Sequence, residues 1–115
     1  MRFLSAVAVA AVGLVSLAQG LEVTAPKDGD VLSRSQPYTV TWAHTPSDAP
    51  RLSIGLSNNH TDFYRQLAND IDTKLGSYTV SLAQGFDGPG YQILLAPYHP
   101  GTGDAALSGY FSLES

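Results

Sequence analysis

One tripeptide in the sequence has a defined covalent chemistry. Asn59-His60-Thr61 matches the Asn-X-Ser/Thr acceptor of N-linked glycosylation, which places a bulky polar sugar on a surface asparagine. The tripeptide stands between two apolar segments, where a loop is expected. The sequence therefore predicts Asn59 as a glycosylation site.

Two carboxylate pairs have spacings that acid–base or metal chemistry could use. Asp70 and Asp72 would project to one side of an extended segment, near the separation of the paired carboxylates of glycoside hydrolases. Asp28 and Asp30 could give oxygen ligands to calcium, but the longer acid series of an EF-hand loop, which ends in Glu, is absent. Because Asp and Asn cap turns through their own side chains, we interpret both pairs as surface turns.

No other set of residues predicts a catalytic centre, a metal site or a cofactor. Gly101-x-Gly103-x-x-Ala106 resembles the dinucleotide fingerprint, but neither a helix nor a later acidic residue follows, so a hairpin loop is predicted. The chain has no cysteine and no Gly-x-Ser-x-Gly elbow, which removes the usual nucleophiles. Three histidines fall in separate predicted loops without a zinc-type spacing: His44, His60 and His99. We therefore expect a protein that is not an enzyme.

Aromatic side chains are the remaining candidates for binding. Tyr64 and Tyr98 fall in loops or on the outward phase of a predicted strand, as does Tyr110. A tyrosine ring at such a position can stack on a sugar, and its hydroxyl can hydrogen-bond to it. We name Tyr64 and Tyr98 as the candidate glycan contacts. The other aromatic residues with an inward phase are assigned to the core: Tyr38, Trp42, Tyr78, Tyr91 and Phe111.

The charge of the chain excludes two classes of partner. The 115 residues have a formal net charge of −4, and 43% are hydrophobic and 14% charged. This composition is that of one globular domain. The few cations are scattered singly, so neither nucleic acid nor an anionic membrane surface is an expected partner.

The first 20 residues predict a signal peptide. Arg2 precedes an apolar run over residues 3–17, and the small residues Ala18 and Gly20 frame a cut before Leu21. The run is shorter than the roughly 20 apolar residues of a spanning helix. We therefore expect a secreted mature domain, residues 21–115, without a transmembrane or glycolipid anchor.

Short segments of alternating apolar and polar residues recur along the mature chain. Each is bounded by Gly, Pro, Asn or Asp, which is typical of half-buried antiparallel strands. Seven such segments predict an all-β, immunoglobulin- or fibronectin-III-like antiparallel β-sandwich. The predicted strands are 21–25, 37–42, 51–57, 63–68, 77–82, 91–96 and 109–113.

Several ordered motifs carry a family resemblance. They are Leu21-Glu22-Val23-Thr24-Ala25-Pro26, Tyr38-Thr39-Val40-Thr41-Trp42, Gly76-Ser77-Tyr78-Thr79-Val80, Gly90-Tyr91-Gln92-Ile93-Leu94-Leu95 and Ser108-Gly109-Tyr110-Phe111-Ser112-Leu113. In this order they resemble the N-terminal domain of the yeast cell-wall synthesis (killer-toxin-resistance) family, which also heads many Ser/Thr-rich glycolipid-anchored fungal proteins. The resemblance implies an extracellular β-sandwich linked to β-1,6-glucan assembly, with no established catalytic residues.

Two functional hypotheses follow. The first is a secreted, non-catalytic fungal cell-wall or extracellular-matrix module that contacts polysaccharide such as β-glucan, or wall proteins. The second is a secreted interaction protein, an effector or adhesin, that acts on a partner organism. Because the sequence shows neither a Ser/Thr-rich stalk nor an anchor signal, a free secreted module is expected in both cases.

Overall fold

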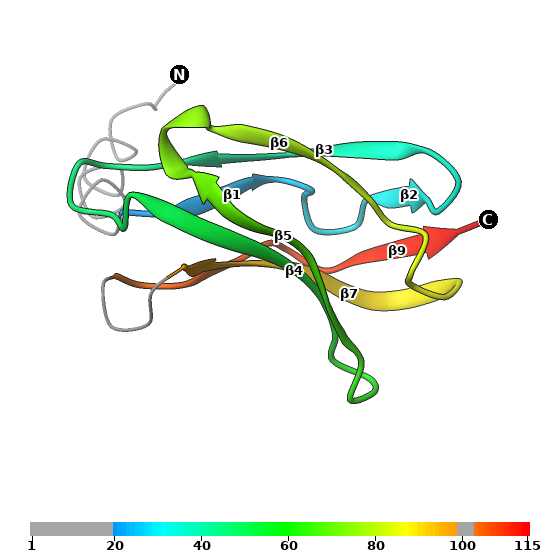
Figure 1. The fold of residues 1–115 in the computed structure, drawn as a ribbon. Coiled ribbons are helices and arrows are strands. Elements are labelled where there is room, and N and C mark those ends of the chain that lie inside the picture. The colour runs from blue at the N-terminus through cyan, green and yellow to red at the C-terminus, as the bar shows by residue number, and fades with distance from the viewer. Residues whose placement is uncertain (1–19, 99–102) are drawn as a thin grey trace, which may run out of the picture.

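Nine strands and one short 3-10 helix make up the part of the chain that the structure describes, residues 20–98 and 103–115 (Figure 1). The structure is a computed structural model. Residues 1–19 of the predicted signal peptide, His99 and Gly101 lie outside the described residues. The elements are β1 Glu22–Ala25, β2 Val31–Ser33, β3 Pro37–Ala43, β4 Arg51–Asn58, β5 Tyr64–Asp72, η1 Thr73–Leu75, β6 Ser77–Ser81, β7 Gly88–Pro97, β8 Ala106–Leu107 and β9 Phe111–Glu114.

The strands form two facing sheets. A three-stranded sheet has the order β1-β3-β6, and a six-stranded sheet has the order β2-β9-β7-β4-β5, with β8 paired to β7. Figure 1 shows the two sheets as layers, with the β4–β5 hairpin extending beyond them. This arrangement confirms the predicted all-β sandwich. The pairing of β2 with β9 is parallel, whereas the sequence predicted only antiparallel neighbours.

Side chains from both sheets fill the interior, in the alternating pattern that the sequence predicted. In β4, Leu52, Ile54 and Leu56 are at most 1% exposed. Burying each such side chain stabilises the fold by about 1.5–3 kcal/mol. The remaining buried members of the core are Val40, Trp42, Ile71, Val80, Leu82, Tyr91, Ile93, Leu95, Phe111 and Leu113.

Two short strands were not predicted. β2 and β8 contain three and two residues, too few to show an alternation. Their backbones are held by the neighbouring strands β9 and β7. β7 also begins three residues earlier than the predicted strand 91–96, at Gly88.

The predicted turn around Asp70 and Asp72 is wrong. Both residues belong to β5, which continues to Asp72. Asp70 has a positive φ of 56°, and the strand pairing is irregular at this level. The Arg51 side chain secures the distortion, because its Nε donates to Asp70 Oδ1 at 2.8 Å and its Nη2 donates to the Asp70 carbonyl at 2.6 Å.

Tyr78 is not a buried core residue, contrary to the prediction. Its side chain shares the phase of Val80, but it is 37% exposed. β6 pairs only with β3 and is therefore the edge of the three-stranded sheet. In an edge strand, a side chain that points toward the interior is therefore not always buried.

Candidate functional site

The outer face of the six-stranded sheet holds the best candidate site. Since Leu52, Ile54 and Leu56 point inward, Gly55 and Ser57 of β4 lie on the outer face. The register places Tyr64 of β5 opposite Ser57, and it places Leu94 of β7 opposite Gly55. Because opposite residues share a face, we call these side chains the outer face.

The Tyr64 ring lies directly over Gly55. A Cβ atom added to Gly55 would overlap the ring and hydroxyl of Tyr64. Only a residue without a side chain leaves room for the phenol to lie against the sheet. Tyr64 is 44% exposed, so part of its side chain lies over Gly55 and the remainder is open to solvent. This is the arrangement of a stacking platform for a planar apolar ligand surface.

Tyr98 lies at the other end of the same face. Its backbone N donates to the Arg51 carbonyl at 3.0 Å, and its residue is partly buried. Tyr98 is thus held at the level of Arg51, whereas Tyr64 is paired with Ser57. The two tyrosines are therefore separated by six residues of β4. At the rise of a strand this is about 20 Å. The two predicted glycan contacts therefore share one face without touching.

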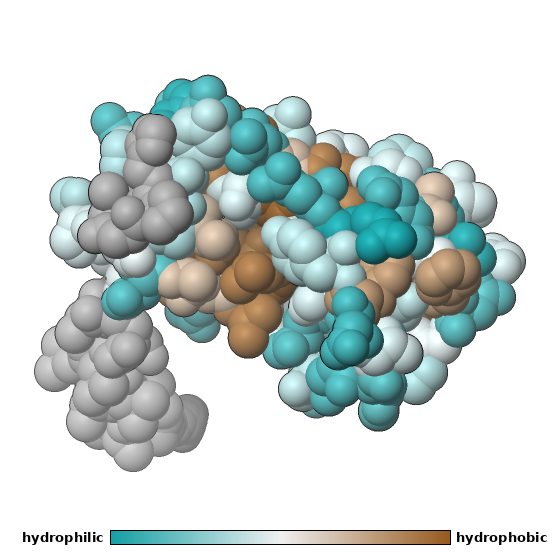
Figure 2. All heavy atoms as spheres, turned by 60° about the horizontal axis from the view of Figure 1, so that its bottom comes forward, coloured by the Kyte–Doolittle hydropathy of each residue, from teal (hydrophilic) through white to brown (hydrophobic). Residues whose placement is uncertain are grey.

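Apolar side chains lie between polar ones on this side of the molecule. Leu107 of β8 is 54% exposed and pairs with Leu94. Figure 2, which brings the six-stranded sheet forward, shows an apolar patch in the middle of this face surrounded by hydrophilic residues. The outer face can therefore offer apolar contact, hydroxyls and amides to one extended ligand.

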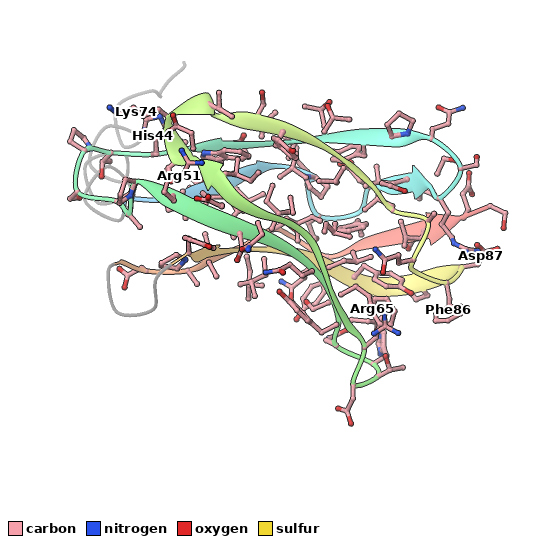
Figure 3. All side chains as sticks on the ribbon, viewed as in Figure 1. His44, Arg51, Arg65, Lys74, Phe86 and Asp87 are labelled. Carbon is pink, nitrogen blue, oxygen red and sulfur yellow. The ribbon has the colours of Figure 1, made fainter. Side chains whose placement is uncertain are left out.

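A second hollow, the aromatic cleft, lies beside the β4–β5 hairpin and has a volume of about 530 Å³. Phe63 meets Phe86 and Tyr91 edge-to-face at centroid distances of 6.0 and 5.9 Å. The Arg65 guanidinium lies 4.9 Å from the Phe63 ring centroid, and Figure 3 shows Arg65 and Phe86 on the same side of the molecule. Phe86 is 65% exposed. This cleft was not predicted from the sequence, although a phenylalanine between turn residues was a usable signal.

The predicted glycosylation site lies at the tip of the β4–β5 hairpin. Asn59 is exposed, and its backbone N donates to the Gly90 carbonyl at 2.9 Å. The Thr61 hydroxyl accepts a hydrogen bond from Phe63 N at 3.2 Å. An exposed hairpin tip has the surface position that an acceptor asparagine requires, and glycosylation of Asn59 stays a prediction.

The other candidate residues lie far apart or accept hydrogen bonds from the backbone. His44 follows β3 and His60 lies in the β4–β5 hairpin, at different ends of the sandwich. Asp28 Oδ1 accepts from Tyr110 N at 3.1 Å, and Asp30 Oδ2 accepts from Lys27 N at 2.8 Å. Among residues 20–98 and 103–115, no group of three or more His, Asp or Glu side chains could hold a metal ion.

Within the described part of the chain, two titratable side chains have shifted pKa values. Hydrogen bonds from Ser115 and from Arg34 hold the pKa of Asp87 below its usual range; Ser115 Oγ lies 2.9 Å from Asp87 Oδ2, and Arg34 Nη1 lies 3.2 Å from Asp87 Oδ1. Burial raises the pKa of Tyr38, and the charge of Asp30 adds to this. Neither group lies on the outer face.

Asp87 gives a pH-dependent prediction. Because its pKa is lowered in the folded state, its contribution is present above the unfolded value, about 3.9, and is lost as the pH falls through the folded value. We expect the urea midpoint of the wild-type protein to fall more steeply below pH 4 than that of Asp87→Asn. Ser115→Ala, which removes the first cause of the shift, should give an intermediate slope. Equal slopes for all three proteins would contradict the prediction.

The fold and the outer face define an immunoglobulin-like β-sandwich domain. Residues 25–113 match the Kre9/KNH-like N-terminal Ig-like domain, and the chain belongs to this family. It is also similar to a UPF0619 GPI-anchored membrane protein of Aspergillus fumigatus, with 32% identity over 83% of this chain and 45% of that protein. An uncharacterized protein of Schizosaccharomyces pombe is 28% identical over 76% of this chain and 25% of its own length.

The chain thus spans less than half the length of these two relatives. The family membership confirms the resemblance found in the sequence. Within the described residues, the structure contains no helix long and apolar enough to cross a membrane.

Proposed function

We propose that the chain is a secreted, non-catalytic module of the fungal cell wall, whose outer face contacts wall polysaccharide such as β-glucan. Its family is linked to fungal cell-wall synthesis and to GPI-anchored wall proteins. In this proposal residues 1–20 are removed on secretion. The observation that carries the proposal is the Tyr64 ring, which lies over Gly55 and is partly open to solvent.

The outer face fits a sugar polymer better than a compact ligand. A pyranose presents an apolar face of C–H groups and a rim of hydroxyls, so it pairs with an aromatic ring beside hydrogen-bonding groups. Tyr64 offers the ring, and Ser57 and Gln92 lie opposite each other on the same face. The roughly 20 Å between Tyr64 and Tyr98 favours an extended chain of sugars.

The test is co-sedimentation of the protein with insoluble β-glucan, chitin and whole walls. Tyr64→Ala and Tyr98→Ala should each reduce the bound fraction several-fold, since single aromatic anchors often carry more than about 1 kcal/mol of binding energy. Tyr78→Ala is the matched control, because Tyr78 is also exposed, at 37%, but belongs to β6 of the three-stranded sheet. Binding unchanged by Tyr64→Ala would overturn the assignment of the outer face.

The same mixtures test the other parts of the proposal. No retention on any polysaccharide or wall would count against a wall module and would favour the effector or adhesin hypothesis. Reproducible release of soluble sugar would show that the protein is an enzyme, contrary to the proposal.

A further inference from the structure

The first described residues are anchored by one carboxylate. The backbone N of Leu21 donates to Asp48 Oδ1 at 3.0 Å, in a partly buried position. The second oxygen, Oδ2, accepts from Thr45 N at 2.6 Å and from the Thr45 hydroxyl at 3.4 Å. The backbone of the loop therefore fixes the Asp48 carboxylate in place before any contact with Leu21 is counted.

The residue preceding Leu21 is crowded against the same carboxylate. Gly20 has a φ of +85°, and a Cβ atom added there would lie 2.7 Å from Asp48 Oδ1. If the chain still has residues before Leu21, the residue beside Asp48 must therefore be a glycine in a left-handed conformation. A chain that begins at Leu21 has no such restriction.

We propose that Asp48 is a binding site for the free α-amino group of Leu21, an inference that rests on the proposed removal of residues 1–20. Peptidase hydrolysis adds one water across the Gly20–Leu21 bond, leaving the carboxylate on Gly20 and the amine on Leu21. At neutral pH the amine takes up a proton. The neutral N–H donor opposite Asp48 then becomes an ammonium group, and its hydrogen bond to a carboxylate is charge-assisted and stronger.

The surroundings leave Asp48 available for this role. The two ion pairs within the described residues join Arg34 to Asp87 and Arg51 to Asp70, so neither uses Asp48. Charged groups near the site are of both signs. Glu22 and Asp104 line a hollow with Leu21, and His44 and Lys74 line a cleft with Asp48.

The pairing joins two parts of the sandwich. Leu21 directly precedes β1 of the three-stranded sheet, while Asp48 belongs to the loop that connects β3 to β4 of the six-stranded sheet. The same loop forms one wall of a cleft of about 650 Å³, whose opposite side includes Lys74; Figure 3 shows His44 and Lys74 close together at this end. Removal of the leader thus strengthens the connection between the sheets at the end where this cleft lies.

A double-mutant cycle tests the pairing. Four proteins are compared by thermal unfolding at low salt: chains that begin at Leu21 or at Ala18, each with Asp48 or with Asp48→Asn. The Asn amide keeps a hydrogen-bond acceptor but removes the charge. We expect Asp48→Asn to lower the melting temperature by about 4–8 °C more in the chain that begins at Leu21 than in the extended chain. Equal losses in the two chains would overturn the proposal.

Two further measurements isolate the charge. Acetylation of the Leu21 amine keeps an N–H donor but removes the positive charge, so the acetylated protein should behave like the extended chain. Asp104→Asn, which makes the same change of net charge in the neighbouring hollow, should change the melting temperature of both chains equally.

The N-terminal sequence of the protein secreted by a fungal host should begin at Leu21. Any other first residue would overturn the inference, while wall binding, measured separately, tests the proposed function.

Discussion

Trp42→Ala is expected to lower the free energy of unfolding by about 3–5 kcal/mol, the range for large-to-small changes at buried aromatic residues. Trp42 is 5% exposed, and its indole Nε1 donates to the Thr73 carbonyl at 2.8 Å. Its backbone N also donates to the Gly76 carbonyl at 2.9 Å. The residue thus ties β3 of the three-stranded sheet to the turn that ends β5. Because small domains are stable by only about 5–15 kcal/mol, this loss should be plain in urea unfolding monitored by circular dichroism.

Trp42→Phe separates the two contributions of the side chain. Phenylalanine keeps most of the ring volume but leaves the Thr73 carbonyl without its indole donor. The expected loss is about 1–3 kcal/mol, the cost of leaving a buried polar group unsatisfied. If Trp42→Phe were as damaging as Trp42→Ala, the hydrogen bond rather than the packing would carry the effect.

Tyr78→Ala is the control for this measurement. The sequence predicted Tyr78 as a core residue with the same phase as Val80, but it is 37% exposed at the edge strand β6. We therefore expect a loss of less than about 1 kcal/mol. A loss as large as that of Trp42→Ala would contradict the exposed position of Tyr78.

The alternation in the sequence predicts the strands that are long enough to show it. β4 and β7 lie inside the six-stranded sheet, and their inward residues were predicted correctly because burial on one face dictates their spacing. β2 and β8 depend instead on the backbone of a partner distant in the chain. Asn69 and Asp70 have turn-forming side chains, yet the pairing with β4 and the Arg51 hydrogen bonds keep this segment in β5. Local composition could not show these long-range contacts.

The candidate site was predictable only in part, for the same reason. Alternation alone placed Tyr64 on the outward phase. That its ring rests on Gly55 depends on the register between β4 and β5, which includes irregular steps. The aromatic cleft likewise requires Phe63 and Phe86 to meet from segments far apart in the chain. The side of a strand that a residue faces can be predicted from the sequence, whereas the contacts between strands depend on the register.

Gly55→Val should abolish the stacking platform without damaging the core. The atoms that a new Cβ would meet belong to the Tyr64 side chain and not to backbone, so the ring can swing away at small cost. Valine also favours the strand conformation over glycine. We expect stability to remain near the wild-type value, while binding to insoluble β-glucan falls about tenfold, which corresponds to 1.4 kcal/mol.

The combination of Gly55→Val with Tyr64→Ala decides whether the glycine acts through the ring. If Gly55 serves only to leave room for the Tyr64 ring, the double variant should bind no worse than Tyr64→Ala alone, because the two changes remove the same contact. Thr39→Val is the control, since Thr39 is exposed on β3 of the three-stranded sheet, and it should bind like the wild type. Additive losses in the double variant would mean that Gly55 contacts the polysaccharide itself. Wild-type binding by Gly55→Val would remove the Tyr64 platform from the proposed function.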